Sequence, residues 1–347
     1  MSRKLASIQR IWKIEPIEGA DRIELAYVLG WKCVVDKGAF QPKDLAVYFE
    51  VDSFLPVKPE FEFLRKSSYK SSEIMGEGFR LRTVKLRGQI SQGLLLPLSI
   101  LPTGYYELNQ DVTSILGVKK WEEEERATTA GTIIGSRPSF IPMTDETRVQ
   151  AMPELIDAFG DLIFYITTKM DGASHSIGID ETGIHVCSRN CEMKDDGKNA
   201  FYEMVKRNEL PKKMRKYMDT SGVKSLVLQG ELCAPGIQSN RLKLKAPQWY
   251  IFTVISDGDR VSLEEMMYVC DILGVKHVPI EEIGKDLKSK YPNVEAVLAR
   301  ADGTYPNGGP KEGIVIRPVD PVRCKLLDGN YLSMKAVSNK YLLKCND

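Results

Sequence analysis

The sequence lacks a surplus of charge of either sign, which limits how it could bind a charged partner. Its 347 residues include 48 lysines and arginines and 47 aspartates and glutamates, so the formal net charge is +1. A nucleic-acid-binding protein with this balance has to gather its positive residues locally and keep its acidic residues for another purpose. Net charge alone therefore identifies no partner.

Long hydrophobic runs and a regular cysteine pattern are also lacking. The longest apolar run, residues 93–101, contains a proline and is far too short to cross a membrane, and the N-terminal residues contain no stretch typical of a signal peptide. The seven cysteines are odd in number and irregularly spaced, which argues against a disulfide framework. We therefore expect a soluble monomer of the cytoplasm or nucleus with reduced thiols and no membrane contact. The absence of a GxxxxGK(S/T) sequence argues against a P-loop kinase or ATPase.

The length suggests two domains, and a change in composition marks the boundary between them. KKWEEEER, at residues 119–126, is charged and lacks a core pattern, and the stretch after it is rich in small polar residues, glycine and proline. Both features are typical of linkers. We predict a first domain at residues 1–120, a linker at 121–137 and a second domain at 138–347.

Short strands with little helix are expected in the first domain. They are rich in Val, Ile, Tyr and Trp, and we predict them at Ala6–Ile14, Arg22–Val28, Lys32–Val35, Leu45–Val51 and Phe79–Leu86. This pattern favours a small closed barrel of the OB type, with residues 60–78 as a long loop. The last strand carries basic residues that could follow a nucleic-acid backbone, namely Arg80, Arg82, Lys85 and Arg87.

The second domain mixes helices with strands. Helices are predicted at Met152–Phe159, Asn199–Arg207 and Leu263–Leu273, and the last has a capping box formed by Ser262 and Glu265 and ends at Gly274. Strands are predicted at Leu162–Thr168, Ser174–Ile179, Ile184–Ser188, Leu226–Leu232, Tyr250–Ile255, Gly313–Arg317 and Tyr331–Ala336. No helix separates several neighbouring strands, so the sheets should be largely antiparallel and the fold class α+β. The basic stretch at residues 206–218 is interpreted as a charged surface run.

Four short segments of the second domain place charged residues at or beside the end of a strand. They are TTKMDGAS, LQGELC, KEGIVIR and LSMKAVSNK, which contain Lys169, Asp171, Glu231, Glu312, Lys335 and Lys340. Charges rarely lie within apolar strands unless they are paired or bind a ligand, so the four segments indicate one shared cleft. Lysines suit phosphate oxygens and carboxylates suit Mg²⁺.

Lys169 is the candidate nucleophile of this cleft. An amine has to lose its proton before it can attack phosphorus, and free lysine has a pKa of about 10.4. Burial together with a nearby cation, such as Lys335 or a metal ion, would favour the neutral amine. Gly172, just after it, would allow a sharp turn and the close approach of a ligand.

These segments resemble, in order, the motifs of the covalent nucleotidyltransferase superfamily, which includes ATP-dependent DNA ligases, RNA ligases and mRNA capping enzymes. KMDG is similar to motif I, SRN at 188–190 to motif Ia and GEL at 230–232 to motif III. YIFTVIS is similar to motif IIIa, with Phe252 or Tyr250 as the ring expected against adenine, EGIVIR to motif IV and SMK to motif V. One residue departs from the pattern, because Val337 stands where motif V usually has a second lysine, and Lys340 is the candidate replacement.

A narrower resemblance covers nearly the whole chain. FIPMTDETRVQ, at residues 140–150, is similar to the TDExRIQ element of RNA ligase 2-like enzymes, and the N-terminal segment with its barrel-first order resembles ATP-dependent RNA ligases of the Deinococcus and Naegleria type. DNA ligases and capping enzymes carry their OB domain after motif V, where only about a dozen residues remain in this sequence. The resemblance therefore favours RNA over DNA as the substrate.

The resemblance implies a role for each matching residue. Lys169 would attack the α-phosphorus of ATP and form lysyl-AMP, AMP would pass to a 5′-phosphate end, and an RNA 3′-hydroxyl would displace it. Asp171, Glu231 and Glu312 would hold Mg²⁺ or Mn²⁺ through its water shell. The residues expected to bind ATP or AMP are Arg148, Thr168, Arg189, Glu231, Phe252, Lys335 and Lys340. The expected partner is RNA with a break in a duplex, including an RNA/DNA hybrid.

Two other functions are compatible with the same residues. One is an ATP-dependent DNA ligase, and the other is a nucleic-acid-binding OB domain fused to a catalytically inactive transferase. The joint presence of Lys169, Glu231, Glu312 and Lys335 argues against an inactive domain. His185, Cys187 and Cys191 could suggest zinc, but no fourth ligand is evident and the motif Ia resemblance explains this stretch better.

Overall fold

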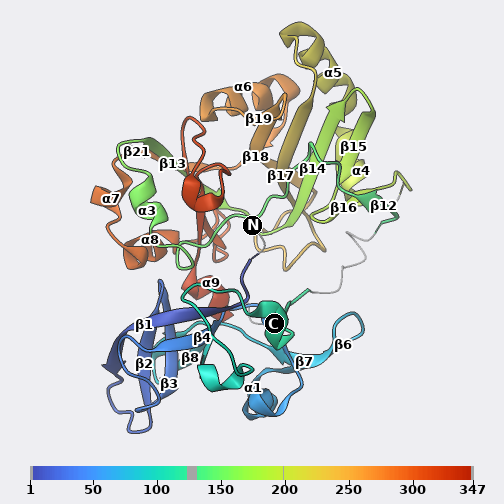
Figure 1. Ribbon diagram of the computed structural model, residues 1–347. Helices are drawn as coiled ribbons and strands as arrows, with labels where there is room; N and C mark the ends of the chain where they lie inside the picture. Colours follow the sequence, from blue (N-terminus) through green and yellow to red (C-terminus); the bar gives the residue numbers. More distant parts are fainter. Residues whose placement is uncertain (1–2, 123–130, 198, 345–347) are drawn as a thin grey trace. The chain divides into compact units, whose positions relative to one another are not determined.

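The computed structural model describes residues 3–122, 131–197 and 199–344 (Figure 1). They divide into two compact units. Unit 1 comprises residues 3–122 together with 149–153 and 342–344, and unit 2 comprises the described residues of 131–148 and 154–341. Residues 123–130, which belong to the predicted linker, lie outside the described residues. Another part of that linker, Ile133–Ser136, forms strand β12.

Unit 1 is built from antiparallel strands around two hydrophobic clusters. A five-stranded sheet has the order β10-β4-β1-β2-β3, a four-stranded sheet has the order β11-β5-β7-β6, and β8 and β9 form a hairpin. The strands are β1 (Ala6–Pro16), β2 (Ile23–Val28), β3 (Trp31–Asp36), β4 (Leu45–Phe49), β5 (Ser53–Pro56), β6 (Tyr69–Ser72), β7 (Gly76–Arg80), β8 (Val84–Leu86), β9 (Gln89–Ser91), β10 (Leu94–Pro97) and β11 (Lys119–Lys120). Alternating burial along β3 shows why these sequences pair as strands, since every second side chain enters the core. Two short helices follow, η2 (Leu98–Ile100) and α2 (Thr113–Leu116).

Two expectations for unit 1 were wrong. The predicted long loop at residues 60–78 contains helices η1 (Pro59–Leu64) and α1 (Arg65–Ser68) and strand β6. Phe61 explains the difference, because its fully buried ring meets Phe49 edge-on at 5.6 Å between centroids and fixes the segment to the core. The predicted strand Phe79–Leu86 is two strands of different sheets, β7 and β8, so its basic residues do not share one strand face.

Unit 2 contains two sheets. The larger has the order β12-β16-β15-β14-β17-β18-β19, with β20 pairing in parallel to β18, and the smaller has the order β21-β13-β22-β23. Their further strands are β13 (Ile163–Lys169), β14 (Ala173–Asp180), β15 (Gly183–Cys187), β16 (Cys191–Met193), β17 (Leu226–Cys233), β18 (Gln248–Ser256), β19 (Asp259–Arg260), β20 (Lys276–His277), β21 (Ile280–Lys285), β22 (Gly313–Pro318) and β23 (Met334–Val337). All other described pairings between these strands are antiparallel, so the expected antiparallel sheets are confirmed.

Helices cover the larger sheet with apolar side chains. α4 (Ala200–Arg207) packs on β15, α5 (Leu210–Ser221) on β14 and α6 (Leu263–Leu273) on β18 (Figure 1). The Ser262 hydroxyl accepts the Glu265 N–H, and Gly274 ends α6 with a positive φ, as the sequence predicted. The other helices are α3 (Leu155–Ala158), α7 (Leu287–Lys290), α8 (Val294–Ala301), η3 (Lys325–Leu327) and α9 (Asn339–Lys344).

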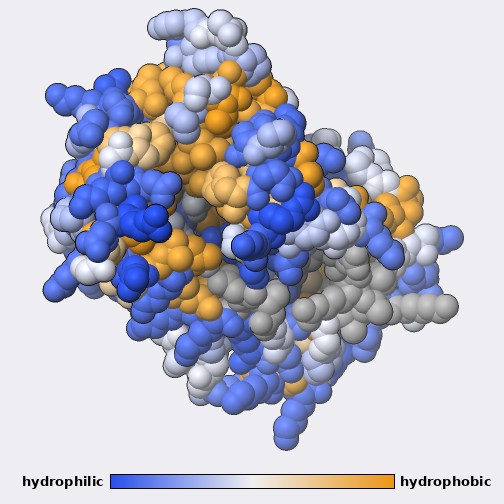
Figure 2. All heavy atoms as spheres, turned by 90° about the horizontal axis from the view of Figure 1, so that it is seen from below, coloured by the Kyte–Doolittle hydropathy of each residue, from blue (hydrophilic) through white to orange (hydrophobic). Residues whose placement is uncertain are grey.

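The basic stretch at residues 206–218 is more than a charged surface run. Leu210, Met214 and Tyr217 recur at helical spacing and are buried in the main cluster of unit 2, so most of the stretch forms α5. Lys212, Arg215 and Lys216 are exposed, whereas Lys213 is partly buried and donates to the Leu273 carbonyl. The face drawn in Figure 2 is largely hydrophilic, with hydrophobic side chains gathered in patches. Among the described residues, no helix combines the length and apolar character that a membrane crossing needs.

Candidate active site

The candidate nucleophile lies where the chain passes from one sheet of unit 2 to the other. Lys169 is the last residue of β13 in the smaller sheet, and Ala173 begins β14 in the larger sheet. Lys169 pairs with Gly313 of β22, and Ala173 pairs with Leu232 of β17. Backbone hydrogen bonds on both sides therefore hold the KMDG segment between the strands that carry the other motifs.

Gly172 is required for this close passage. A Cβ at this position would lie 2.9 Å from Cys233 Sγ and 3.0 Å from Glu231 Cγ, and it would also meet the Leu232 carbonyl oxygen. Any larger residue would push KMDG away from β17. The spacing between Lys169 and Glu231 therefore depends on a glycine that itself carries no chemistry.

Lys169 lies among carboxylates. Its ammonium donates to Glu312 Oε2 at 2.6 Å, and Glu231 and Asp171 also act on its charge. Burial alone would lower the pKa of Lys169, but the three acidic residues outweigh it and raise that pKa above its ordinary value. The acids therefore favour the charged amine, and the neutral amine expected from the sequence depends on a nearby cation that offsets them.

The same group of charges also changes the pKa of Glu231. Burial, opposed by Lys169 and reinforced by Glu312 and Asp171, raises the pKa of Glu231 to about 7. The carboxylates of Glu231, Glu312 and Asp171 outnumber the cations that pair with them, Lys169 and Arg241, so a divalent cation would neutralise the remaining negative charge. Carboxylate oxygens such as those of Glu231 and Glu312 suit such a cation, directly or through its water shell. The described residues contain no group of three or more Asp, Glu, His or Cys side chains that could hold a metal ion.

Asp171 is engaged by two residues that the sequence analysis missed. Arg241 Nη1 donates to one of its oxygens at 2.6 Å, and the Tyr341 hydroxyl donates to the other at 2.9 Å. The Arg241 guanidinium also lies 4.8 Å from the centre of the Tyr341 ring. Asp171 is only 5% exposed, so this pair compensates its buried charge.

Tyr305 was also missed, although it contacts the backbone of two site residues. Its hydroxyl donates to the Lys169 carbonyl oxygen at 2.8 Å and accepts the Glu312 N–H at 3.2 Å. Next to it, the Thr168 hydroxyl donates to Glu281, which also binds Lys311 and Arg300. Thr168 therefore uses its side chain to fix the end of β13.

Lys335 and Arg148 lie together as the motifs suggested. The two residues form an isolated parallel β-bridge, and the Lys335 N–H donates to the Thr147 carbonyl at 2.8 Å. Lys335 pairs with Val315 of β22. Val337, at the unusual position of motif V, is buried and pairs with Gly313. Lys340 lies outside this group on α9, where its exposed ammonium pairs with Asp302 at 3.1 Å.

The candidate adenine-contacting rings lie on β18. Tyr250 and Phe252 are two residues apart on the same strand and pack on the apolar cluster around Met170 and Tyr305. The buried Arg317 guanidinium lies 5.7 Å from the centre of the Phe252 ring, donates to the Phe252 carbonyl and pairs with Glu146 at 2.5 Å. This contact fastens the segment of Arg148 to β18 and β22.

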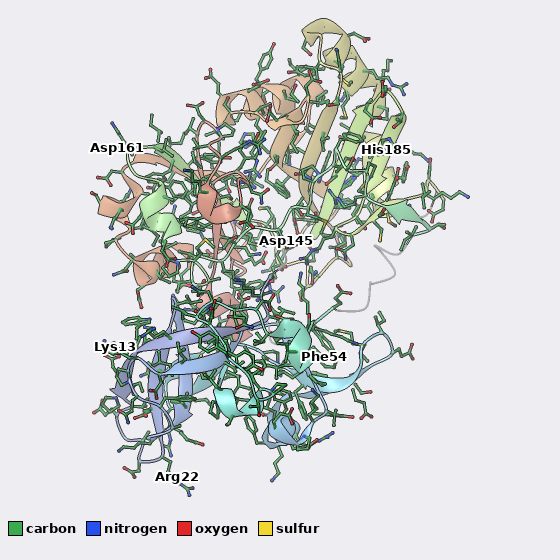
Figure 3. The ribbon with its side chains drawn as sticks, viewed as in Figure 1. Lys13, Arg22, Phe54, Asp145, Asp161 and His185 are labelled. Atoms are coloured by element: carbon green, nitrogen blue, oxygen red, sulfur yellow. The ribbon has the colours of Figure 1, made fainter. Side chains whose placement is uncertain are left out.

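Arg189 Nη2 donates to both carboxylate oxygens of Asp145, which is labelled in Figure 3, at 2.6 and 2.8 Å. Asp145 belongs to the TDExR element, so this pair joins the two segments that resemble phosphate-binding motifs. His185, also labelled, hydrogen-bonds Glu192 at 2.7 Å and Thr182 at 2.9 Å. Its two ring nitrogens are thereby engaged by neighbouring side chains.

Comparisons with known proteins agree with the motif order. One family model, described as an OB-fold domain, matches residues 5–98, and another, described as RNA ligase, matches residues 162–337. The predicted barrel-first α+β architecture is thereby confirmed. A search of curated proteins finds no match.

Solved structures of Naegleria gruberi RNA ligase are similar over the full length. An apo point mutant is 36% identical with a TM-score of 0.89 and covers 99% of both chains. The form with PPi is 36% identical with a TM-score of 0.88 and again covers 99% of both chains. A point mutant with ATP and Mn is 35% identical with a TM-score of 0.87 and covers 98% of both chains.

Proposed function

We propose that this chain, which belongs to the RNA ligase family, seals a break between a 3′-hydroxyl and a 5′-phosphate of RNA held in a duplex. It is an ATP-dependent RNA ligase. The observation that carries the proposal is the contact of Lys169 with Glu312, beside Glu231, at the junction of the two sheets of unit 2.

Lys169 supplies the nucleophile of the first step. Its ammonium has to release one proton, and Glu312, already hydrogen-bonded to it at 2.6 Å, is the nearest acceptor. The freed amine attacks the α-phosphorus of ATP, an N–P bond forms, and the bond to the β-phosphate breaks so that pyrophosphate leaves. The product is lysyl-AMP at Lys169.

Mg²⁺ or Mn²⁺ supplies charge neutralisation at the phosphates when it is bound. Glu231 and Glu312 would hold it, since their carboxylates contribute the negative excess of the site. Asp171 would join them on release from Arg241 and Tyr341, which hold both of its oxygens. The same three carboxylates raise the pKa of Lys169, so neutralising them also eases its deprotonation.

Two further steps complete the reaction. The 5′-phosphate of one RNA end attacks lysyl-AMP and releases the Lys169 amine, which leaves an adenylylated RNA end. The 3′-hydroxyl of the other end then attacks the 5′-phosphorus, AMP leaves, and the phosphodiester bond is made. Each sealing event consumes one ATP and yields one AMP and one pyrophosphate.

The remaining predicted residues bind the nucleotide in this proposal. Arg148, Lys335 and Arg189 neutralise phosphate charge, and Phe252 lies against adenine. Thr168 acts through the end of β13, because its hydroxyl is committed to Glu281. Lys340 would have to leave Asp302 before it could reach a phosphate, which makes it the weakest member of the group.

Labelled ATP tests the first step directly. The protein is incubated with ATP labelled at the α-phosphate and with Mg²⁺ or Mn²⁺, and we expect covalent label on wild type and none on Lys169→Ala. The same variant should still join an RNA end that is supplied already adenylylated. Absence of label on wild type with either metal would reject the enzyme and favour the catalytically inactive nucleic-acid-binding fusion.

Nicked duplexes identify the polymer. We expect sealing when RNA provides the 3′-hydroxyl side, including in an RNA/DNA hybrid, and much slower sealing of an all-DNA nick. Equal sealing of both would favour the DNA ligase alternative. The free thiols of the described cysteines support a reducing compartment, the cytoplasm or nucleus, and gel filtration should show a monomer.

A further inference from the structure

On three neighbouring strands of unit 1, the exposed Trp12 and two lysines surround the buried ring of Tyr27. Lys13 of β1 pairs with Tyr27 of β2, and Tyr27 pairs with Lys32 of β3, so the three side chains form one row across the sheet. Trp12 joins this row from β1. We call Trp12, Lys13, Tyr27 and Lys32 the Trp12 surface. Lys13 is labelled in Figure 3.

A β-bulge places Trp12 beside Lys13. Ile11 pairs with Val28 and Lys13 with Tyr27, so Trp12 is the extra residue between two consecutive pairs. Without this bulge, strand alternation would send Trp12 and Lys13 to opposite sides of the sheet. Bulges commonly re-aim a side chain in this way, and here the result is a tryptophan directed outward.

The Trp12 ring is exposed but held in place. It is 54% exposed, whereas Trp31 and Trp249 are buried. Its indole N–H donates to the Leu29 carbonyl at 2.9 Å, and its ring lies 5.2 Å from the Tyr27 ring. A fixed and exposed aromatic ring loses little conformational freedom when a planar partner stacks on it.

Positive charge borders this ring pair. The ammonium groups of Lys13 and Lys32 each lie 5.3 Å from the centre of the Tyr27 ring. Glu15 compensates part of this charge, because it pairs with Lys13 at 2.5 Å and accepts the Tyr27 hydroxyl. The exposed ring of Trp12 therefore lies against the buried Tyr27 ring that the two lysines border, which matches a ligand with a planar apolar group and a neighbouring phosphate.

We propose that the Trp12 surface binds an unpaired nucleotide of the RNA substrate, with its base stacked on Trp12 and its phosphates near Lys13 and Lys32. Bases inside a duplex are already stacked on both faces, whereas an unpaired nucleotide has a base face free to stack on Trp12. This inference rests on the proposed RNA ligation. A protein partner is less well matched, because it would bury both lysines around a small apolar area.

Fluorescence titration with a short single-stranded oligoribonucleotide tests the stacking. Base–aromatic stacking predicts that Trp12→Ala raises the Kd roughly 5- to 150-fold, while Trp12→Phe keeps most of the affinity. Affinity is followed through labelled RNA, so that the variants without Trp12 can be measured in the same way. Tyr105→Ala is the matched control, since Tyr105 is an 85% exposed aromatic residue of unit 1 outside this surface, and it should leave the Kd unchanged.

Salt dependence tests the lysines independently. The double variant Lys13→Gln and Lys32→Gln should reduce the slope of log K against log salt by about 1.4, which corresponds to two phosphate contacts on single-stranded RNA. A blunt RNA duplex without unpaired nucleotides should bind wild type and Trp12→Ala equally. Thermal unfolding of each variant checks that it remains folded.

The possible outcomes separate this inference from the proposed function. If wild type seals RNA but Trp12→Ala and wild type bind the oligoribonucleotide equally, the Trp12 surface has another occupant, such as a protein, and the inference is wrong. If wild type takes no label from ATP and seals nothing while Trp12→Ala still weakens binding, the proposed function fails and the nucleotide site remains.

Discussion

The Tyr305 hydroxyl connects the nucleophile to one of its carboxylates through main-chain atoms. It binds the carbonyl of Lys169, which ends β13, and the N–H of Glu312, which directly precedes the neighbouring β22. Tyr305→Phe removes both hydrogen bonds and should lower the rate of lysyl-AMP formation roughly 10- to 100-fold, because small misplacements of reacting groups are costly. Single-turnover labelling with α-labelled ATP measures this rate.

If Tyr305 positions the reacting groups, a second result is expected for Tyr305→Phe. The KM for ATP should change much less than the maximal rate, and sealing of pre-adenylylated RNA should be less affected than formation of lysyl-AMP. A variant that lost stability and all steps in equal measure would show that Tyr305 serves only the fold.

Gly172 offers a second test at the level of one residue. Gly172→Ala puts a methyl group against the Leu232 carbonyl and Cys233, so we expect a loss of about 1–3 kcal/mol in the free energy of unfolding and a strong fall in adenylylation. Gly135→Ala is the control, since no atom lies within 4 Å of its added Cβ. Equal effects of the two substitutions on urea unfolding and labelling would contradict the close-packing argument.

Glu146 and Arg317 connect three elements, and their ion pair predicts a dependence of stability on pH. Burial opposes the Glu146 charge, but Arg317 and Arg260 outweigh it and lower the pKa of Glu146 from 4.5 to about 2. A carboxylate with a depressed pKa stabilises the fold fully above its unfolded pKa and loses that contribution as the pH falls toward the folded value. The contribution should therefore disappear between about pH 4.5 and pH 2.

Urea unfolding at a series of pH values measures this effect. The difference in unfolding free energy between wild type and Glu146→Gln should shrink as the pH falls through this window, by at most about 1.4 kcal/mol per pH unit. Glu181→Gln, at an exposed position, should show no such trend. A constant difference across the window would mean that the pair does not titrate as its surroundings indicate.

Elements with a strong local pattern were predictable from the sequence. Ser262 and Glu265 mark the beginning of α6 and Gly274 marks its end, and the prediction of its bounds was correct. Phe61 was harder, because a single buried ring within a charged stretch leaves no period to detect. The helical spacing in α5 was present, but it was hidden by the lysines and arginines between its buried residues.

The same distinction holds for the candidate site. Lys169, Glu231 and Glu312 stand at strand ends within motifs, so their grouping could be anticipated from the sequence. Tyr305 and Tyr341 could not, because each reaches its partner across more than a hundred residues, 136 and 170 positions respectively. Such contacts depend on the tertiary packing of strands and helices that are distant in the sequence, and a local sequence pattern contains no information on that packing.

Nucleotide binding should stabilise only part of the whole molecule. Every residue proposed to contact ATP lies in unit 2, so ATP with Mn²⁺ at about 100 times its Kd should add about 2.7 kcal/mol to the unfolding free energy of that unit. Lys169→Ala prevents turnover and allows the measurement by calorimetry. Lys335→Ala in the same background should reduce the shift. An equal rise for a separate transition of unit 1 would show that the nucleotide stabilises both units.

The contacts of Tyr305 have a practical consequence for experiments on inactive forms. Both of its partners are main-chain atoms, so a substitution of the side chain at Lys169 or Glu312 leaves the two hydrogen bonds of Tyr305 in place. An enzyme silenced at either position should consequently keep its nucleotide pocket assembled. Such variants are therefore suited to structure determination of an unreacted complex with ATP and an RNA end.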